Sequence, residues 1–206
     1  MKNIVFLMLL LASMRILNAG ELNFDSMKNE YIRTSEEIEV LLKEKISKQL
    51  KRQKEACQKG KAIGCFNLGK LYYVGVGTKR SIKNAKYHFK RACSLGMGIG
   101  CFYVGRKFSN SKKEKIKYYK ASCKKGYDAG CTELGSMYLH GRDTKQDFQK
   151  AYRYLDKACN ERNHADGCHL MAAIYYNGLG KNKSTSLTNK YLKKAKRLRR
   201  YPWKYK

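Results

Sequence analysis

The sequence predicts an all-α fold built as a stack of antiparallel helix pairs, and three observations support this fold class. Four cysteine pairs recur along the chain, each with seven or eight residues between its members. Apolar, small and aromatic residues recur three, four and seven positions after the second cysteine of each pair, which places them on one face of an α-helix. The chain has a single proline and no stretch of the alternation that is typical of strands.

The cysteines mark four copies of one repeated unit. The first cysteines of successive pairs lie 36, 30 and 36 residues apart. We expect the small residue in the middle of the first helix to let a neighbouring helix approach closely, with the aromatic residue filling the space one turn on. The small residues are Gly69, Gly105, Gly135 and Ala172, and the aromatic residues are Tyr72, Phe108, Tyr138 and Tyr175. The second helix of each unit is expected to end at the first cysteine of the next pair.

This pattern divides the chain into a leader, a linker, a capping helix, four repeats and a tail. The expected boundaries are 1–19 for a signal peptide, 20–33 for the linker, 34–58 for the N-terminal capping helix, 59–94, 95–124, 125–160 and 161–198 for the repeats, and 199–206 for a basic aromatic tail. A capping-box pattern that starts at Thr34 predicts the start of the capping helix. The second repeat is six residues shorter, because only Ser109-Asn110-Ser111 joins its two helices.

The first twenty residues are typical of a secretory signal peptide. An apolar run from Ile4 to Ala12 follows Lys2, and Arg15 ends it well short of the length that a membrane-spanning helix needs. We expect cleavage after Ala19, with Gly20 as the alternative, and no transmembrane segment in the remaining chain. Eight cysteines in an exported protein indicate an oxidised framework. The sequence therefore predicts a secreted or periplasmic protein.

The chain is strongly basic, with 45 Lys and Arg residues against 16 Asp and Glu residues and a net charge of +29. This charge favours anionic partners such as lipid headgroups or acidic cell-wall glycans. Export makes nucleic acid the least expected partner, so no nucleic-acid binding is predicted. Self-repulsion at this charge favours a monomer, and nothing in the sequence predicts a cofactor.

The repeated residues resemble a known family. The segment Ala56-Cys57-x7-Cys65, followed by Leu68-Gly69-x-x-Tyr72, then Gly75-x-Gly77 and Ala92-Cys93, looks like the Sel-one-like repeat. The cysteine spacing makes the chain similar to the Helicobacter cysteine-rich protein family over about residues 50–198. The resemblance implies a right-handed α/α solenoid related to tetratricopeptide arrays, with one disulfide per repeat.

The position of the cysteines predicts how they pair. Each pair flanks a turn at which two antiparallel helices come together, and only there can two Cα atoms approach within the roughly 7 Å that a disulfide requires. The predicted bridges are Cys57 with Cys65, Cys93 with Cys101, Cys123 with Cys131, and Cys159 with Cys168. Zinc motifs usually have about two to four residues between paired cysteines, and the four histidines do not recur at one repeat position. No metal site is therefore predicted.

The resemblance also implies an activity, because members of the cysteine-rich family are described as penicillin-binding proteins with weak β-lactamase activity. Serine β-lactamases combine S-x-x-K with S-D-N and K-T-G elements. This chain has S-x-x-K at Ser109 and at Ser122 but neither of the other elements. In a chain so rich in lysine two such matches are expected by chance. The sequence identifies no catalytic residue and leaves open whether the protein is an enzyme.

The function that the residues favour is a scaffold that binds a protein, a peptide or an anionic ligand. The alternative, implied by the resemblance, is a penicillin-binding protein that weakly hydrolyses the β-lactam ring. Solenoids bind partners on a surface lined by one helix of each pair. Positions two and five residues after the second cysteine vary between repeats, as a recognition surface requires, although an ordinary solvated face would look the same. The candidate ligand-facing residues are Asn67, Lys70, Tyr103, Arg106, Glu133 and Ser136.

Overall fold

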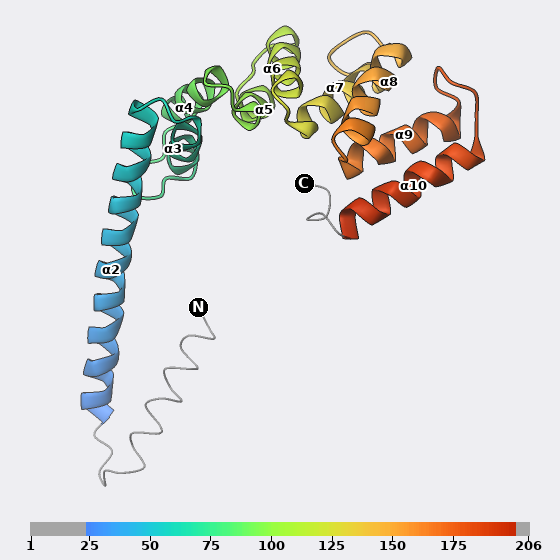
Figure 1. Cartoon of the computed structure of the whole chain (residues 1–206). Helices are drawn as coiled ribbons and strands as arrows, with labels where there is room; N and C mark the ends of the chain where they lie inside the picture. Colours follow the sequence, from blue (N-terminus) through green and yellow to red (C-terminus); the bar gives the residue numbers. More distant parts are fainter. Residues whose placement is uncertain (1–23, 201–206) are drawn as a thin grey trace. The chain divides into compact units, whose positions relative to one another are not determined.

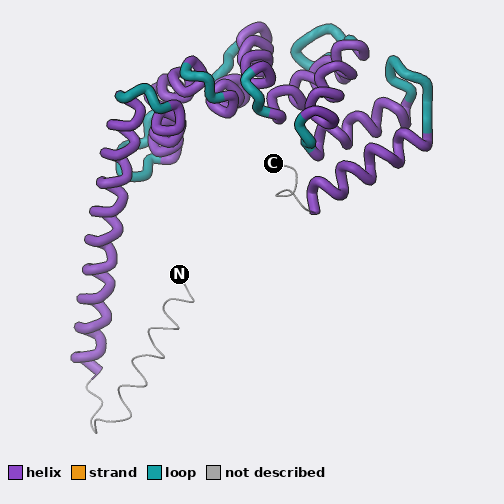
Figure 2. The backbone as a smooth tube through the Cα atoms, in the orientation of Figure 1, coloured by secondary structure: helices purple, strands orange, loops and turns teal. Residues whose placement is uncertain are grey.

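The computed structural model describes residues 24–200 and the side chains of residues 36–200. All regular structure in this part of the chain is helical (Figure 2), which confirms the predicted fold class. The chain divides into two compact units, Met1–Ser47 and Lys48–Lys206. The predicted signal peptide and the last six residues of the predicted tail lie outside the described residues.

Helix α2, Phe24–Gln58, begins ten residues before the predicted start of the capping helix. Residues 24–33, expected as part of a linker, are therefore helical. The physical reason is local, since no glycine or proline occurs between Glu21 and Lys59 to stop the helix. In the first unit this helix carries apolar side chains that are 43–63% exposed, namely Ile38, Val40, Leu41 and Leu42.

The second unit contains the end of α2 and then four antiparallel helix pairs that follow one another along the chain (Figure 1). The pairs are α3 (Ala62–Val74) with α4 (Ile82–Ser94), α5 (Gly98–Lys107) with α6 (Lys112–Lys124), α7 (Asp128–His140) with α8 (Phe148–Asp156), and α9 (Ala165–Asn177) with α10 (Thr185–Arg200). The two helices of each pair pack against each other. The second helix of a pair also packs against the first helix of the next pair, so the repeats form a continuous stack.

Each second helix begins at a side chain that caps its free backbone N–H groups. Ser81, Ser111 and Asp147 accept a hydrogen bond from the backbone N–H three residues on. Ser184 accepts one in the same way from Leu187, at the start of α10. Such caps are worth about 1 kcal/mol each and fix where the turn ends and the helix starts.

A disulfide joins each repeat to the helix before it, with the pairing predicted from the sequence. The bridges Cys57–Cys65, Cys93–Cys101, Cys123–Cys131 and Cys159–Cys168 have Cα–Cα distances of 4.4 to 4.7 Å. The first cysteine of each pair lies near the end of one helix, and the second lies in the first turn of the next. All eight cysteines are buried, and none is free.

The glycine before the second cysteine allows the two helices to approach closely at each disulfide. A Cβ atom on any of these glycines would lie 2.5 to 3.0 Å from a side chain of the preceding helix. In the first repeat, the Cβ atom of Ala56 would be only 2.5 Å from a Cβ atom on Gly64. Equivalent contacts occur at the other three, which are Gly100, Gly130 and Gly167.

The longer Cys159–Cys168 spacing is accommodated by a π-helical turn, Lys157–Glu161, that surrounds Cys159. Such a turn absorbs one extra residue within a helix. The next turn has Asn163 in the left-handed conformation (φ 54°), where the first three repeats have a glycine. Asparagine tolerates this conformation better than most residues. The disulfide therefore keeps its Cα–Cα distance, 4.6 Å, despite the insertion.

Stacked rings connect the two helices of three repeats. Tyr138 of α7 and Tyr154 of α8 have centroids 5.8 Å apart and planes within 4°. The first and fourth repeats have the same arrangement at the same positions, in the pairs Tyr72–His88 and Tyr175–Tyr191. The sequence pattern identified the first ring of each pair but not the second. The second repeat lacks the stacked pair, because Phe108 lies beyond the end of α5 and packs against Phe89 of the first repeat.

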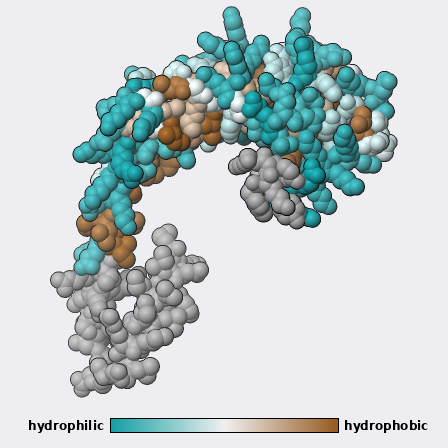
Figure 3. Space-filling view, viewed as in Figure 1, coloured by the Kyte–Doolittle hydropathy of each residue, from teal (hydrophilic) through white to brown (hydrophobic). Residues whose placement is uncertain are grey.

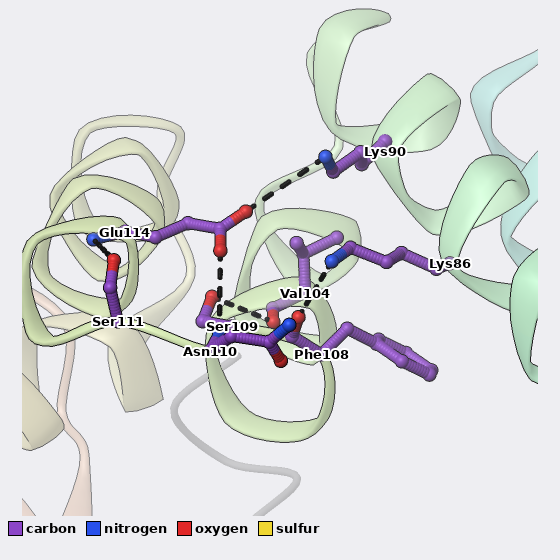
Figure 4. A network of polar contacts seen from close by, with 8 residues as sticks. All are labelled: Lys86, Lys90, Val104, Phe108, Ser109, Asn110, Ser111 and Glu114. Atoms are coloured by element: carbon purple, nitrogen blue, oxygen red, sulfur yellow. Dashed lines mark hydrogen bonds and ion pairs between the residues drawn. The ribbon is translucent and has the colours of Figure 1, made fainter.

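Polar contacts stabilise the short turn of the second repeat (Figure 4). Ser109 donates a hydrogen bond to the Val104 carbonyl (3.1 Å), which also accepts one from the backbone N–H of Phe108 at the end of α5. Lys86 of α4 donates to the carbonyl of Phe108 (2.8 Å), where a cation also complements the helix dipole. Glu114 accepts from the backbone N–H of Asn110. The shorter turn is thus held by direct contacts, two of them with Lys86 and Lys90 of the first repeat.

The residue immediately before the first cysteine is alanine in three of the four pairs, and in the remaining pair it is Ser122. Its hydroxyl is fully buried and has no hydrogen-bond partner. We expect Ser122→Ala to raise the free energy of unfolding by about 1–3 kcal/mol, since it removes an unsatisfied polar group. Urea denaturation of the oxidised protein measures this. The matched control is Ala92→Ser, which should lower stability at the equivalent place, and an unchanged Ser122→Ala midpoint would contradict the prediction.

Candidate functional site

The six candidate ligand-facing residues lie at equivalent positions of three first helices. Asn67 and Lys70 are on α3, and the other four follow in the same order on α5 and α7. Helices α5 and α7 pack against each other. The Phe66 ring of α3 is 5.4 Å from the Tyr103 ring of α5, so neighbouring repeats are in direct contact along these helices.

Lys70 and Arg106 are the two exposed members of this set. The Lys70 ammonium lies 6.0 Å from the centroid of the Phe66 ring, and the Arg106 guanidinium carbon lies 5.6 Å from that of Phe102. A cation in this position is attracted to the ring face. Neither has a carboxylate partner among the side chains that the structure describes. The repeat thus presents an uncompensated positive charge at the same place twice.

The structure gives three of the other candidates partners inside the fold. The Asn67 side-chain amide donates to the side-chain oxygen of Gln53 (3.2 Å). Tyr103 is half-buried and packs against both hydrophobic clusters of the second unit. Ser136 is 9% exposed and accepts a hydrogen bond from Arg142. The residue type at these positions therefore varies between repeats at least as much because of packing as because of exposure. The sequence alone does not distinguish the two causes.

Glu133, the sixth candidate, is half-buried, and its carboxylate affects the pKa of Tyr119 on the neighbouring helix α6. Burial of the phenol, with a further contribution from the Glu133 carboxylate, raises the pKa of Tyr119 to about 12. The Tyr119 ring is itself 4% exposed and packs against the Phe102 ring. A neutral phenol is therefore kept in the core at any physiological pH.

A second candidate site is a pocket of about 400 Å³ on the third repeat, which the sequence did not single out. It combines the stacked Tyr138–Tyr154 pair with four cations. The lining residues are Lys120, Tyr138, Lys150, Arg153, Tyr154 and Lys157. They come from α6, α7, α8 and the π-helical turn, and only Tyr138 belongs to the repeat pattern, so a scan for periodicity could not group them.

The two S-x-x-K serines do not form a Ser–Lys pair in the described part of the chain. Ser109 donates to the Val104 carbonyl, and Ser122 is 0% exposed. No hydrogen bond joins either serine to the lysine three residues later. A serine nucleophile has to reach both its base and the substrate. Neither residue meets these requirements.

Two of the four histidines, His88 and His164, have side-chain contacts within the fold. His88 stacks on Tyr72, and the Nδ1 atom of His164 is 2.9 Å from the Thr132 hydroxyl oxygen. Burial, with the nearby Arg91 as a lesser cause, lowers the pKa of His88. Within residues 36–200 no three His, Cys, Asp or Glu side chains gather closely enough to hold a metal ion. No helix among the described residues has the length and apolar character to cross a membrane.

Comparison with known proteins decides the family. The model of the Sel1 repeat matches residues 62–97, 128–163 and 165–198. The chain belongs to the Sel1 repeat family. The three matched segments contain the first, third and fourth helix pairs, which have the stacked rings. The second pair, which has the short turn, folds in the same way without being matched by the Sel1 repeat model.

Solved structures with Sel1-like folds support the architecture. A Sel1 repeat protein from Oxalobacter formigenes is 19% identical, with a TM-score of 0.64 over 72% of this chain and 61% of that protein. The antigen c5321 of uropathogenic Escherichia coli, described as having an SLR fold, is 22% identical, with a TM-score of 0.58 over 76% of this chain and 41% of that protein. The Sel1 chain thus spans less than two thirds of either neighbour, and both comparisons concern the fold alone.

The resemblance to the Helicobacter cysteine-rich proteins is also confirmed. Cysteine-rich protein B of Helicobacter pylori is 31% identical to this Sel1 chain, and the match covers 58% of this chain and 89% of that protein, with a TM-score of 0.49. The Sel1 repeats carry the family assignment. No curated protein matches the chain.

Proposed function

We propose that this protein is an exported Sel1 scaffold that binds a protein or peptide partner through the face of its first helices. Sel1 repeats are typical protein-interaction modules. The observation that carries the proposal is the recurrence of an exposed cation, Lys70 and then Arg106, over a ring at one repeat position. Each is free of a described carboxylate partner, so each is available to an acidic group on another molecule.

The disulfides support both the binding role and the export. Four buried bridges hold successive repeats together before any partner arrives. A pre-organised surface loses less conformational entropy on binding, which favours affinity. Disulfides also form and persist in oxidising compartments. We therefore propose secretion or a periplasmic location, with residues 1–19 acting as the signal peptide.

The penicillin-binding activity implied by the family resemblance is not part of this proposal. Hydrolysis of a β-lactam by a serine enzyme requires an accessible hydroxyl beside a base. Ser122 is fully buried, and the Ser109 hydroxyl donates to a backbone carbonyl.

Peptide selection on the oxidised protein tests the proposed function. A library of displayed peptides is selected on immobilised protein, and enriched sequences are synthesised for affinity measurement. Loss of the two cations in Lys70→Ala with Arg106→Ala should weaken binding about tenfold, as expected for residues central to an interface.

The matched control carries Lys79→Ala with Lys83→Ala, which removes the same charge from exposed positions in the first repeat. Its affinity should change less than about twofold, as is typical of peripheral surface charges. Failure to enrich any sequence, or equal losses in the two variants, would reject the first-helix face as the binding surface.

A further inference from the structure

The pocket on the third repeat has an excess of positive charge among its lining residues. Lys120, Arg153 and Lys157 have no carboxylate partner among the described side chains. Lys150 forms an ion pair with Asp147, and its ammonium also lies 5.5 Å from the centroid of the Tyr138 ring. A pocket with uncompensated cations on several helices attracts anionic groups.

Two stacked tyrosine rings contribute to the lining of the pocket. Tyr138 is 7% exposed, and its ring stacks against Tyr154 at 5.8 Å. The backbone of Tyr138 is held in α7, close to the helix pair that the Cys123–Cys131 bridge fixes. A ligand in the pocket therefore meets aromatic side chains as well as cations. Arg153 adds a planar guanidinium, which suits a carboxylate in a bidentate geometry.

Comparison between repeats indicates that this combination is particular to the third one. For the Tyr175–Tyr191 pair of the fourth repeat, the preceding helix α8 has Asp156 at the position that Lys120 has on α6, so an acid replaces a base. In the first repeat, Tyr87 occupies the place of Arg153. The second repeat keeps bases at both positions but lacks the stacked rings. Among the described repeats, only the third has both the ring pair and cations at both positions.

We propose that this pocket binds the carboxylate side chains of an acidic segment of a partner protein. The inference rests on the proposed protein-binding function and specifies the chemical groups of the partner that are recognised, namely carboxylates. A volume of about 400 Å³ lies at the lower end of the range for specific ligand sites. It accommodates one or two side chains of a peptide, whereas the rest of the segment continues over the surface.

Binding of a glutamate-rich peptide tests the proposal. The probe is a fluorescein-labelled eight-residue peptide with four glutamates, and its partner probe has glutamine at those places. Anisotropy is measured on the oxidised protein at about 0.15 M salt, where long-range attraction is screened. We expect Lys120→Gln with Arg153→Gln to weaken binding of the glutamate peptide about tenfold. The matched-charge control, Lys79→Gln with Lys83→Gln, should change it less than about twofold.

Three results would overturn the proposal. Equal losses in the two variants would mean attraction by net charge alone, and equal binding of the glutamine peptide would mean that carboxylates are not recognised. Tighter binding of polygalacturonate than of the peptide, lost in the pocket variant, would assign the pocket to acidic glycans. The Lys70→Ala with Arg106→Ala variant is measured separately with the glutamate peptide. If this variant still binds the peptide, the pocket proposal holds even when the test of the first-helix face has failed.

Discussion

Reduction of the four disulfides is expected to unfold the second unit. Each bridge closes a loop of about nine residues, which is worth roughly 2.5 kcal/mol by restricting the unfolded chain. Four bridges together contribute about 10 kcal/mol, comparable with the whole stability of a typical domain. Helical content measured by circular dichroism should therefore be lost as thiols appear in a reductant titration.

Removal of one bridge makes the prediction quantitative. Cys123→Ala with Cys131→Ala deletes the bridge between the second and third repeats, and urea denaturation should show a loss of about 2.5 kcal/mol. The other bridges remain, so the variant should still fold. A fully reduced protein with an unchanged urea midpoint would contradict the structural role assigned to the cysteines.

Substitution of Gly130 is expected to have the second large effect. A Cβ atom there would lie 2.5 Å from the Ser122 hydroxyl oxygen, 2.6 Å from the Ser122 Cβ atom and 2.9 Å from the backbone nitrogen of Cys123. The backbone of Cys123 is tied through its disulfide and cannot easily move. We expect Gly130→Ala to lower the free energy of unfolding by about 3 kcal/mol, at the upper end of the usual cost of overpacking. Urea denaturation of the oxidised protein measures the change.

Two further variants separate the steric cause from other effects. Ser122→Ala combined with Gly130→Ala should remain strongly destabilised, because the contact between the two Cβ atoms persists. A Cβ atom on Gly60 would have open space around it, and only the positive φ of 75° disfavours alanine there. Gly60→Ala should therefore lower the free energy of unfolding by nearer 1 kcal/mol. Wild-type stability in Gly130→Ala would mean that the helices are not packed as closely as the structure has them.

The helix pairs and their bridges were predictable from sequence because both depend on local spacing. Apolar and small residues at offsets of three, four and seven place Leu134, Gly135 and Tyr138 on one face of α7, and the structure buries all three. A cysteine on each side of a short turn fixes which partner lies within reach. The start of α2 was predicted less well, because the capping-box pattern at Thr34 lies inside a longer helix.

The sites were less predictable, because they depend on contacts between helices. Asn67 and Ser136 looked like exposed variable positions, yet both are satisfied by neighbouring side chains. The pocket is formed by residues of three helices and a π-helical turn, and no spacing in the sequence relates Lys120 to Arg153. The end of the array is a further case, since Leu192 matches the position of the buried Leu155 but is 41% exposed. No described helix follows α10 to cover it.

By itself, the sequence determined the fold class, the number of helix pairs and the pairing of all eight cysteines, since the helical period and the short turns act within a few tens of residues. Only the tertiary structure decided which polar side chains remain at the surface, as Figure 3 displays for one face of the repeats. It also brought Tyr154 onto Tyr138 and surrounded that pair with cations. Such features depend on how neighbouring helices pack, and packing joins residues whose distance along the chain carries no signal.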